Sequence, residues 1–293
     1  MYVWGILREN DLRIVRLSLL YLIPCSRSSL PRVYRSGLYE RIAMDYAGVV
    51  LKDRYELLSS LGEGGHGRVY LARDRHLEQF AAVKAVGKEH PSAVEALERE
   101  CSILCGLHHP AIPRILDFFR ERELVYLVME FVEGRNLQEL SGQEVPGTAR
   151  LYEWGMQICE ILSYLHRECR PPLIYGDLKP ANLILGRDGR IRLVDFGSTV
   201  PFRDGRTAEQ HLGTIGFAAP EQYPSEDIPL TCGADIYGLG ATLKVLAEGR
   251  LRSFWLTWIL HKCMRAKPEK RYASVIQLYR NFQIGRFFCA KKK

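Results

Sequence analysis

The hydrophobic pattern changes once along this chain, and the change limits the folds open to it. Between residues 54 and 132, short apolar runs separated by glycine-rich or charged turns predict strands, with one helix among them. The expected strands span residues 55–61, 68–73, 80–86 and 124–131, and the expected helix spans 92–107. The sequence therefore predicts a small, β-rich first lobe in an α+β protein.

The second half of the chain has a different hydrophobic pattern. Apolar positions at helical spacing predict helices over residues 151–165, 235–248, 254–265 and 273–283. Between them, Asp188-Gly189 separates two short apolar runs, which is a strong signal for a hairpin. The second lobe is thus expected to be larger and mainly helical, joined to the first by a hinge near 132–136. A cleft between two such lobes is the expected ligand site.

The charge distribution argues against a nucleic-acid partner. The 293 residues carry a net charge of +7, but residues 1–43 and 285–293 each contribute +4. The remaining body of the chain is close to neutral, whereas a nucleic-acid-binding domain concentrates basic charge on its fold. We therefore expect no nucleic-acid partner, and we expect residues 285–293 to form a basic C-terminal tail.

The N-terminal 53 residues lack the regular patterns of the body. Their apolar run, Leu17 to Ile23, is far shorter than the ~18 residues that a membrane-spanning helix needs. We interpret residues 1–53 as an irregular extension, with Met44 as a candidate start of the natural protein. Peripheral membrane contact through residues 1–43 and an ordered structural element are the alternatives left open.

The cysteines favour a cytosolic protein. None of the eight shows C-x-x-C spacing, and the one close pair, Cys101 and Cys105, has no second pair to complete a metal site. We interpret them as reduced, small core residues, and we expect the protein to be cytoplasmic, with no transmembrane segment.

Two segments in the first lobe carry residue types suited to phosphate binding. The run from Gly62 to Gly67 lies between two expected strands, and its glycines let backbone N–H groups approach a phosphate. Lys84 follows on the next strand, inside an apolar run. An inward-facing lysine needs an anionic partner, and Glu100 is the candidate, with Glu95 and Glu98 as alternatives.

Three more segments follow in the second lobe. Asp177, Lys179 and Asn182 share one turn, where a carboxylate can accept a hydroxyl proton and an amide oxygen can bind a hard cation. Asp195-Phe196-Gly197 comes directly after a strand and offers a second carboxylate for a divalent metal. Ala219-Pro220-Glu221 completes the series.

In this order and spacing, the five segments resemble the signature of protein kinases. From Arg54 to Phe282 the chain is similar to bacterial Hanks-type serine/threonine kinases, and residues 213–222, 235–240 and 267–272 add to the likeness. The resemblance implies a bilobal protein-kinase fold over residues 54–284, with an N-lobe over 54–132 and a C-lobe over 133–284.

The resemblance also implies the site. Asp177 would deprotonate the attacking hydroxyl, Lys179 would contact the transferring phosphate, and Asn182 and Asp195 would hold Mg²⁺ or Mn²⁺. The residues that would bind ATP are Gly62, Gly64, Gly67, Val69, Ala82, Lys84, Glu100, Met129, Glu130, Val132 and Asn136. Supporting roles would fall to Thr214 beside the substrate hydroxyl, Asp235 under the catalytic loop, and Glu221 paired with Arg271.

The implied function is transfer of the γ-phosphate of ATP to serine or threonine hydroxyls of proteins, with autophosphorylation possible. Two alternatives stay open at this point. One is a pseudokinase scaffold that binds nucleotide without catalysis. The other is a small-molecule phosphotransferase of kinase-like fold, which the long segment from Asp195 to Glu221 disfavours.

The sequence departs from the family in two places. Tyr175-Gly176 stands where the family has His-Arg, and glycine cannot supply the guanidinium that binds a phosphorylated activation loop. We therefore expect activity that does not depend strongly on loop phosphorylation, although Ser198, Thr199 and Thr207 offer hydroxyls. The C-lobe is also shortened after residue 249, which would expose apolar surface near Trp255 and Trp258.

Overall fold

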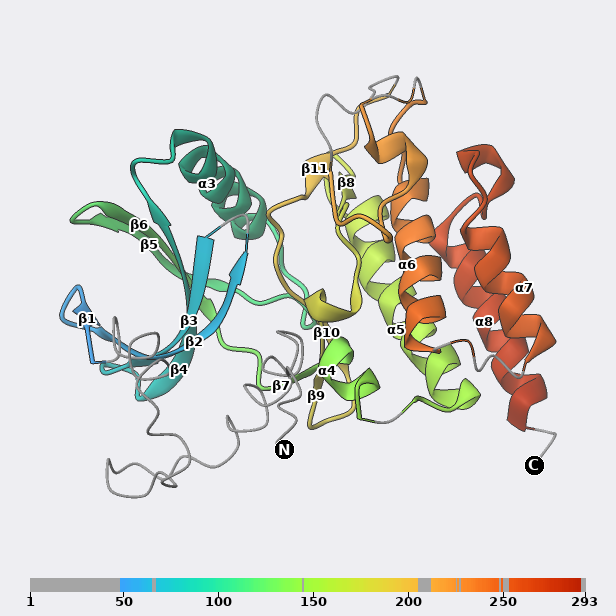
Figure 1. The fold of residues 1–293 in the computed structure, drawn as a ribbon, viewed down its shortest axis with the longest axis horizontal. Coiled ribbons are helices and arrows are strands. Elements are labelled where there is room, and N and C mark those ends of the chain that lie inside the picture. The colour runs from blue at the N-terminus through green and yellow to red at the C-terminus, as the bar shows by residue number, and fades with distance from the viewer. Residues whose placement is uncertain are drawn as a thin grey trace, which may run out of the picture.

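A computed structural model describes residues 48–290 except 65–66, 144, 205–211, 225, 227, 248 and 250–252. The described chain forms two lobes side by side, one built on a sheet and one built mainly of helices (Figure 1). This arrangement confirms the α+β, bilobal prediction.

The N-lobe is a six-stranded antiparallel sheet with one helix against it. The strands run in the order β1-β2-β3-β4-β6-β5, and the helix, α3 (Pro91–Cys105), packs against β4, β5 and β6. The strand bounds are β1 (Val50–Leu51), β2 (Tyr55–Gly64), β3 (Gly67–Asp74), β4 (Gln79–Gly87), β5 (Ile115–Glu121) and β6 (Leu124–Glu130). The four expected strands are confirmed, and β1 and β5 are additional.

The C-lobe holds the remaining helices and three short strand pairs. Its helices are α4 (Leu137–Ser141), α5 (Thr148–Arg167), α6 (Gly233–Leu246), α7 (Phe254–Cys263) and α8 (Val275–Ala290). The strands are β7 (Gly134–Asn136), β8 (Leu173–Ile174), β9 (Leu183–Gly186), β10 (Ile191–Leu193) and β11 (Val200–Pro201). The β9–β10 hairpin turns at the predicted Asp188-Gly189, with Gly189 at φ +75°.

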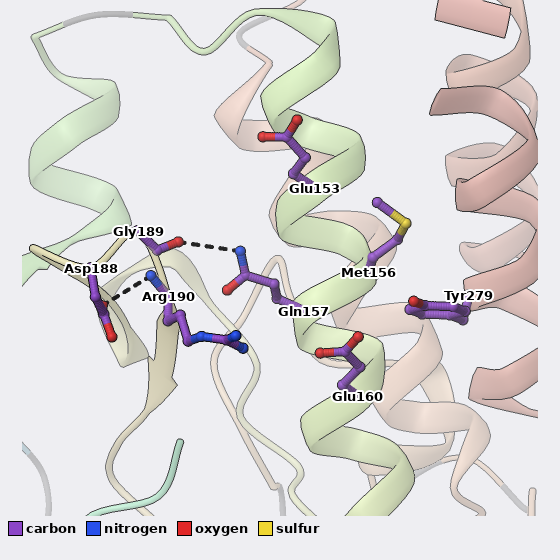
Figure 2. A pocket seen from close by; sticks show the side chains of 8 residues that line it. All are labelled: Glu153, Met156, Gln157, Glu160, Asp188, Gly189, Arg190 and Tyr279. Atoms are coloured by element: carbon purple, nitrogen blue, oxygen red, sulfur yellow. Dashed lines mark hydrogen bonds between the residues drawn. The ribbon is translucent and has the colours of Figure 1, made fainter. Parts of the chain in front are cut away.

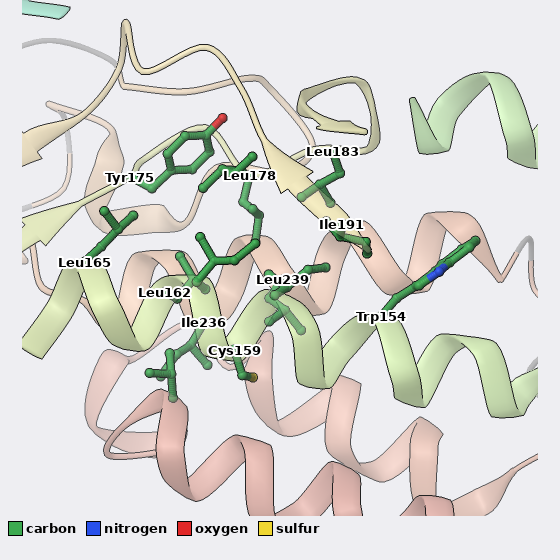
Figure 3. Packing of buried hydrophobic residues seen from close by; sticks show 14 of the residues in the cluster. Trp154, Cys159, Leu162, Leu165, Tyr175, Leu178, Leu183, Ile191, Ile236 and Leu239 are labelled. Carbon is green, nitrogen blue, oxygen red and sulfur yellow. The ribbon is translucent and has the colours of Figure 1, made fainter. Parts of the chain in front are cut away.

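The core of the C-lobe lies between α5, α6 and the loop that follows β8. Leu162 and Leu165 of α5 meet Ile236 and Leu239 of α6, and Tyr175 and Leu178 lie over them (Figure 3). Burying these side chains stabilises the fold by about 25 cal/mol per Å² of apolar surface. The loop that follows β8 therefore rests on a rigid core.

The structure corrects both predicted ends of the domain. Residues 285–290 belong to α8 and do not form a separate basic tail, because Gly285 is buried against Tyr152 and Trp255. At the other end, β1 pairs with β2, so ordered structure begins inside the segment assigned to an irregular extension. Calls on residues 1–47 and 291–293 lie outside the described residues.

The expected shortening of the C-lobe leaves an aromatic surface. Only seven residues separate the end of α6 from the start of α7. Trp255 and Trp258 are 37% and 44% exposed, as predicted, and Phe254 is 84% exposed. The two tryptophan rings lie 5.6 Å apart, so the surface is continuous along α7.

A fully buried ion pair joins two distant parts of the C-lobe. It connects the end of the segment from Asp195 to Glu221, here called the activation segment, to the loop before α8. The Arg271 guanidinium donates two hydrogen bonds, of 2.5 and 2.7 Å, to the Glu221 carboxylate, and both side chains are 0% exposed. Arg271 also donates to the carbonyls of Gly233, Arg265 and Ala266. Removing one partner of such a pair leaves an uncompensated buried charge.

Arg271→Met should therefore lower the free energy of unfolding by about 3–5 kcal/mol. Urea unfolding followed by tryptophan fluorescence measures this loss. Arg286→Met is the control, because Arg286 pairs with Glu153 at the surface and its removal should cost at most about 1 kcal/mol. Equal losses in the two variants would contradict the role of burial.

Candidate active site

The register of the N-lobe sheet places the predicted nucleotide residues on one face. Lys84 of β4 lies opposite Val69 of β3, and Ala82 lies opposite Met129 of β6. Cross-strand partners share a face, and so do residues two apart on one strand. Lys84, Val69, Ala82 and Met129 therefore share one face of the sheet.

Lys84 meets two carboxylates. Its Nζ atom lies 2.7 Å from Glu100 Oε2 and 3.0 Å from Asp195 Oδ1. Glu100 comes from α3, so the structure selects it over Glu95 and Glu98. The second oxygen of Glu100 accepts a 3.1 Å hydrogen bond from the backbone N–H of Phe196, which connects α3 to the second lobe.

The electrostatics keep this lysine charged. Burial by itself lowers the pKa of Lys84, but Asp195 and Glu100 outweigh it, and the net pKa is raised. Burial raises the pKa of Glu100, and Lys84 offsets part of that effect. Since a buried ammonium between two carboxylates is favoured, the pair is an ion pair. Its positive charge lies beside Asp195, whose side chain is 38% exposed.

The glycine-rich segment forms the turn between β2 and β3. Gly62 lies opposite Val69 and is exposed, and Gly64 pairs with Gly67. Gly67 has φ +106°, and a Cβ there would come within 2.5 Å of the Ala85 carbonyl oxygen. Only glycine satisfies both conditions, so the start of β3 lies close to the backbone of β4.

At the hinge, the structure refines two predicted residues. The Glu130 carboxylate is held by Arg114, with a 2.7 Å bond from its Nε atom. Asn136 is the N-cap of α4: its Oδ1 accepts from the Glu139 N–H at 2.9 Å. Both side chains thus have structural partners, and Val132 between them is partly buried.

The catalytic loop, from Tyr175 to Asn182, carries three of the predicted side chains: Asp177, Lys179 and Asn182. Asp177 accepts hydrogen bonds from Thr214 Oγ1 at 2.7 Å and from Lys179 Nζ at 2.8 Å. Lys179 also reaches Thr214 Oγ1 at 2.7 Å, and Asn182 Nδ2 donates to the Asp177 backbone oxygen at 3.0 Å. Asp177 is 7% exposed, so a lysine and a hydroxyl fix a nearly buried carboxylate.

A second buried carboxylate holds this loop from below. Asp235 of α6 accepts from the backbone N–H groups of Tyr175 and Gly176, at 2.9 and 2.8 Å, and contacts His166 Nε2 at 2.8 Å. The bracing role expected of Asp235 is confirmed by this geometry. The sequence analysis missed His166, which sits in the last turn of α5 and supplies a third partner.

Tyr175 fills the position that the resemblance assigns to histidine. Burial raises the pKa of its hydroxyl, which stays protonated and donates to the Val194 carbonyl oxygen at 2.7 Å. Its ring meets Phe196 edge-to-face at 5.3 Å. The loop residue and the Asp195-Phe196-Gly197 segment are thereby packed together.

Gly176 has a conformation that explains its identity. Its φ is +82°, and a Cβ would lie 2.8 Å from the Ser198 carbonyl oxygen. Its own carbonyl accepts a 2.6 Å bond from Gln222 Nε2. Sequence reasoning did not single out Gln222, because a neutral amide beside Glu221 gives no motif signal.

One predicted phosphorylation site is not accessible. Thr199 is 5% exposed, and its hydroxyl donates to the Tyr175 carbonyl oxygen at 3.3 Å. The expectation that Thr199 offers a free hydroxyl is therefore wrong. Ser198 is partly exposed, and Thr207 lies outside the described residues.

The donor set suits a divalent cation. Asp195 has φ +63°, which turns it out of the strand direction, and its side chain is 38% exposed next to the buried Lys84. The predicted ligands, Asn182 and Asp195, supply the amide and carboxylate oxygens that Mg²⁺ prefers. They come from the catalytic loop and from the end of β10, and Lys84 links this point to the N-lobe.

The described cysteines, which exclude Cys25, form no cluster for a soft metal. Burial and the neighbouring Cys105 raise the pKa of Cys101 to about 11, so that thiol is protonated. Among the described residues no cluster of three His, Cys, Asp or Glu side chains could hold a metal. Cys159 and Cys263 are core residues as expected, whereas Cys105 is exposed.

Two cavities lie away from Asp177. One, of about 370 Å³, is lined by Gln157 and Tyr279 together with three acidic side chains of α5 and the β9–β10 turn (Figure 2). The other, of about 600 Å³, reaches Glu130 and Val132 on the hinge. The first contains none of the predicted site residues.

Comparison with known proteins decides the family. The protein kinase domain family matches residues 55–257, well over half of the chain. The chain belongs to the protein kinase family. The match begins at the first residue of β2 and ends within α7.

Bacterial serine/threonine-protein kinases are among its relatives. The chain is 34% identical over 213 residues to a protein of Streptomyces coelicolor named "probable serine/threonine-protein kinase", covering 68% of this chain and 31% of the relative. It is 32% identical over 211 residues to serine/threonine-protein kinase PknB of Mycobacterium tuberculosis, covering 68% and 33%. The chain therefore spans about a third of the length of these curated relatives.

Gly176→Ala should lower the free energy of unfolding by about 1–3 kcal/mol, because the left-handed backbone and the Ser198 carbonyl both oppose a Cβ. Gly189→Ala is the matched control: φ is +75° there, but a Cβ meets nothing within 4 Å. Chemical unfolding of both variants measures the difference. A larger loss for Gly189→Ala would contradict the close packing at Gly176.

Proposed function

We propose that this chain is a protein kinase that transfers the γ-phosphate of ATP to serine or threonine side chains of proteins. The observation that carries the proposal is the assembled pair of clusters: Lys84 with Glu100 and Asp195, and Asp177 with Lys179 and Thr214. Retention of both clusters favours catalysis over a pseudokinase scaffold.

The charged groups of the two clusters suit different steps of the phosphate transfer. Lys84 carries a fixed positive charge at the cleft, which suits the α- and β-phosphates of ATP. Asp177 suits the acceptance of a proton from the attacking hydroxyl, and Lys179 suits neutralisation of the phosphate in transfer. When bound, a divalent metal would balance phosphate charge, held by Asn182 and Asp195; we propose Mg²⁺ or Mn²⁺.

A hydroxyl acceptor fits the immediate surroundings of Asp177. Its carboxylate already accepts a hydrogen bond from one aliphatic hydroxyl, that of Thr214, at 2.7 Å. The segment that carries Thr214 continues to the buried Glu221–Arg271 pair, so it is a fixed platform for a peptide. A fixed platform beside the carboxylate favours peptide substrates over small molecules.

Localisation and partners follow from the chemistry. No helix in the described part of the chain is long and apolar enough to cross a membrane. ATP-dependent transfer needs cellular ATP, so we place the kinase domain in the cytoplasm, with protein substrates as partners. Autophosphorylation is an outcome of the same reaction.

Asp177→Asn should lower phosphate transfer by about 10²–10⁴-fold, because it removes the proton acceptor. Binding of a fluorescent ATP analogue should change little, since Lys84 and Asp195 remain. Transfer of labelled phosphate from ATP to a generic basic protein measures the reaction. Glu153→Gln, an acid-to-amide change in the cavity that contains none of the predicted site residues, is the control, and undiminished transfer by Asp177→Asn would refute the proposal.

Activity should also be insensitive to phosphatase, because Gly176 offers no guanidinium to a phosphorylated loop. Phosphatase treatment, verified by intact mass, should leave most of the transfer rate. Loss of most activity on treatment would show that loop phosphorylation is needed after all.

A further inference from the structure

The side chain of Gln222 connects three backbone segments of the active site. It belongs to the short 3₁₀ turn Pro220–Gln222 and is 1% exposed. Its Nε2 donates to the carbonyl oxygens of Gly176, at 2.6 Å, and Leu212, at 3.1 Å. Its Oε1 accepts from the Ala219 N–H at 2.8 Å. Both donors and the acceptor of this amide are therefore used.

These partners lie on either side of the catalytic groups. Gly176 directly precedes Asp177, and Leu212 lies two residues before Thr214, whose hydroxyl contacts Asp177. The backbone N–H of Leu212 also donates to the Gln222 carbonyl at 3.1 Å. Gln222 thus joins the backbone segment before Asp177 to the backbone segment before Thr214, and the side chains of Asp177 and Thr214 meet at the proton acceptor.

The Gly176 peptide is held from two directions. Asp235 accepts its N–H at 2.8 Å, and Gln222 donates to its C=O. The backbone of Gly213 approaches the same carbonyl so closely that a Cβ at 213 would collide with it. With φ +86° at Gly213 and +82° at Gly176, both glycines allow the loop and the segment to touch.

From this geometry we propose that Gln222 is a positioning residue that holds the activation segment on the catalytic loop by neutral hydrogen bonds. It takes the place of the ionic link that a loop phosphate and an arginine before Asp177 would form. The proposal rests on the proposed kinase function, and it adds the residue that sets the geometry of Asp177 and Thr214 without phosphorylation.

The charge of residue 222 is the sharpest test. A carboxylate at this site cannot donate to the two carbonyl oxygens, whereas a protonated carboxyl can donate to one of them. Burial beside two carbonyl oxygens raises the pKa of a carboxyl group. Gln222→Glu should therefore be impaired at neutral pH and recover in part as the pH falls.

We expect Gln222→Glu to lower kcat/KM for a peptide or generic protein substrate by about 10–100-fold at pH 7.5, while the affinity for an ATP analogue stays near wild type. The ratio of its activity to that of wild type should rise between pH 8 and pH 6. The surrounding charged groups, Asp177, Glu221 with Arg271, and Asp235, are common to both proteins, so the ratio isolates residue 222.

Gln157 provides a matched control far from Asp177. Its Nε2 donates to the Gly189 carbonyl at 3.2 Å (Figure 2). Its Oε1 accepts from the Ile191 N–H at 2.8 Å. It is thus a second glutamine that joins a helix to a backbone turn. Gln157→Glu should keep the wild-type kcat/KM and show no rise of the activity ratio at low pH.

Gln222→Met keeps the bulk without charge or donors, and it serves if the glutamate variant does not fold. It should lose kcat/KM by a similar factor, with a ratio to wild type that does not change with pH. Unchanged kcat/KM in a folded Gln222 variant, or an equal loss in Gln157→Glu, would overturn the proposal.

Amide hydrogen exchange separates this proposal from the proposed function. The backbone amides of Gly176 and Leu212 should exchange faster in Gln222→Met than in wild type, whereas Gln157→Met should leave them unchanged. If wild type transfers no phosphate, the kinase proposal fails while the exchange result still judges the role of Gln222. If both amides exchange as slowly in Gln222→Met as in wild type, the proposal that Gln222 holds the activation segment on the catalytic loop is wrong.

Discussion

The buried ammonium group of Lys84 is the charge on which the site depends. It lies on the sheet of the first lobe, pairs with Glu100 of α3 and reaches Asp195 of the second lobe. Glu100 also accepts the Phe196 N–H, and removing Lys84 would leave the buried Glu100 carboxylate without its counter-ion. The relative position of the lobes and the readiness of the nucleotide site are thus controlled by one small network.

A second network, built on hydrogen bonds to backbone groups, holds the catalytic loop in place. Asp235 accepts two backbone N–H groups of the catalytic loop, and Gln222 donates to a carbonyl of the same loop. Beneath them, Leu162, Leu165 and Leu239 form an apolar floor that resists displacement (Figure 3). Asp177 is therefore positioned by groups that do not take part in its chemistry.

Residues that belong to short sequence motifs could be predicted from the sequence. Lys84 was expected to need an anionic partner, and the resemblance to protein kinases implied Glu100 for it and Thr214 beside the substrate hydroxyl. The Lys84–Glu100 ion pair and the Thr214–Asp177 hydrogen bond agree with these expectations. Contacts that depend on tertiary approach were not predictable. Gln222 acts on carbonyl oxygens ten and forty-six residues away, and only the fold brings these atoms together.

Two predictions failed for the same physical reason. Residues 285–293 were predicted to be a basic tail because Arg286 and three lysines lie there, yet α8 continues to Ala290 and the small Gly285 packs against Tyr152. Thr199 was expected to offer a hydroxyl, yet it is 5% exposed and its hydroxyl donates to the Tyr175 carbonyl oxygen. Local composition gave no sign of either neighbour.

The neutrality of the Gln222 amide has a consequence for how such an enzyme is governed. A link between a phosphate and a guanidinium has two states, which a second enzyme can write and erase. An amide bonded to backbone carbonyls has one state at every physiological pH. A catalytic centre assembled in this way is ready from the moment the chain folds, and its output is then set by how much of the protein is made and by which substrates reach it.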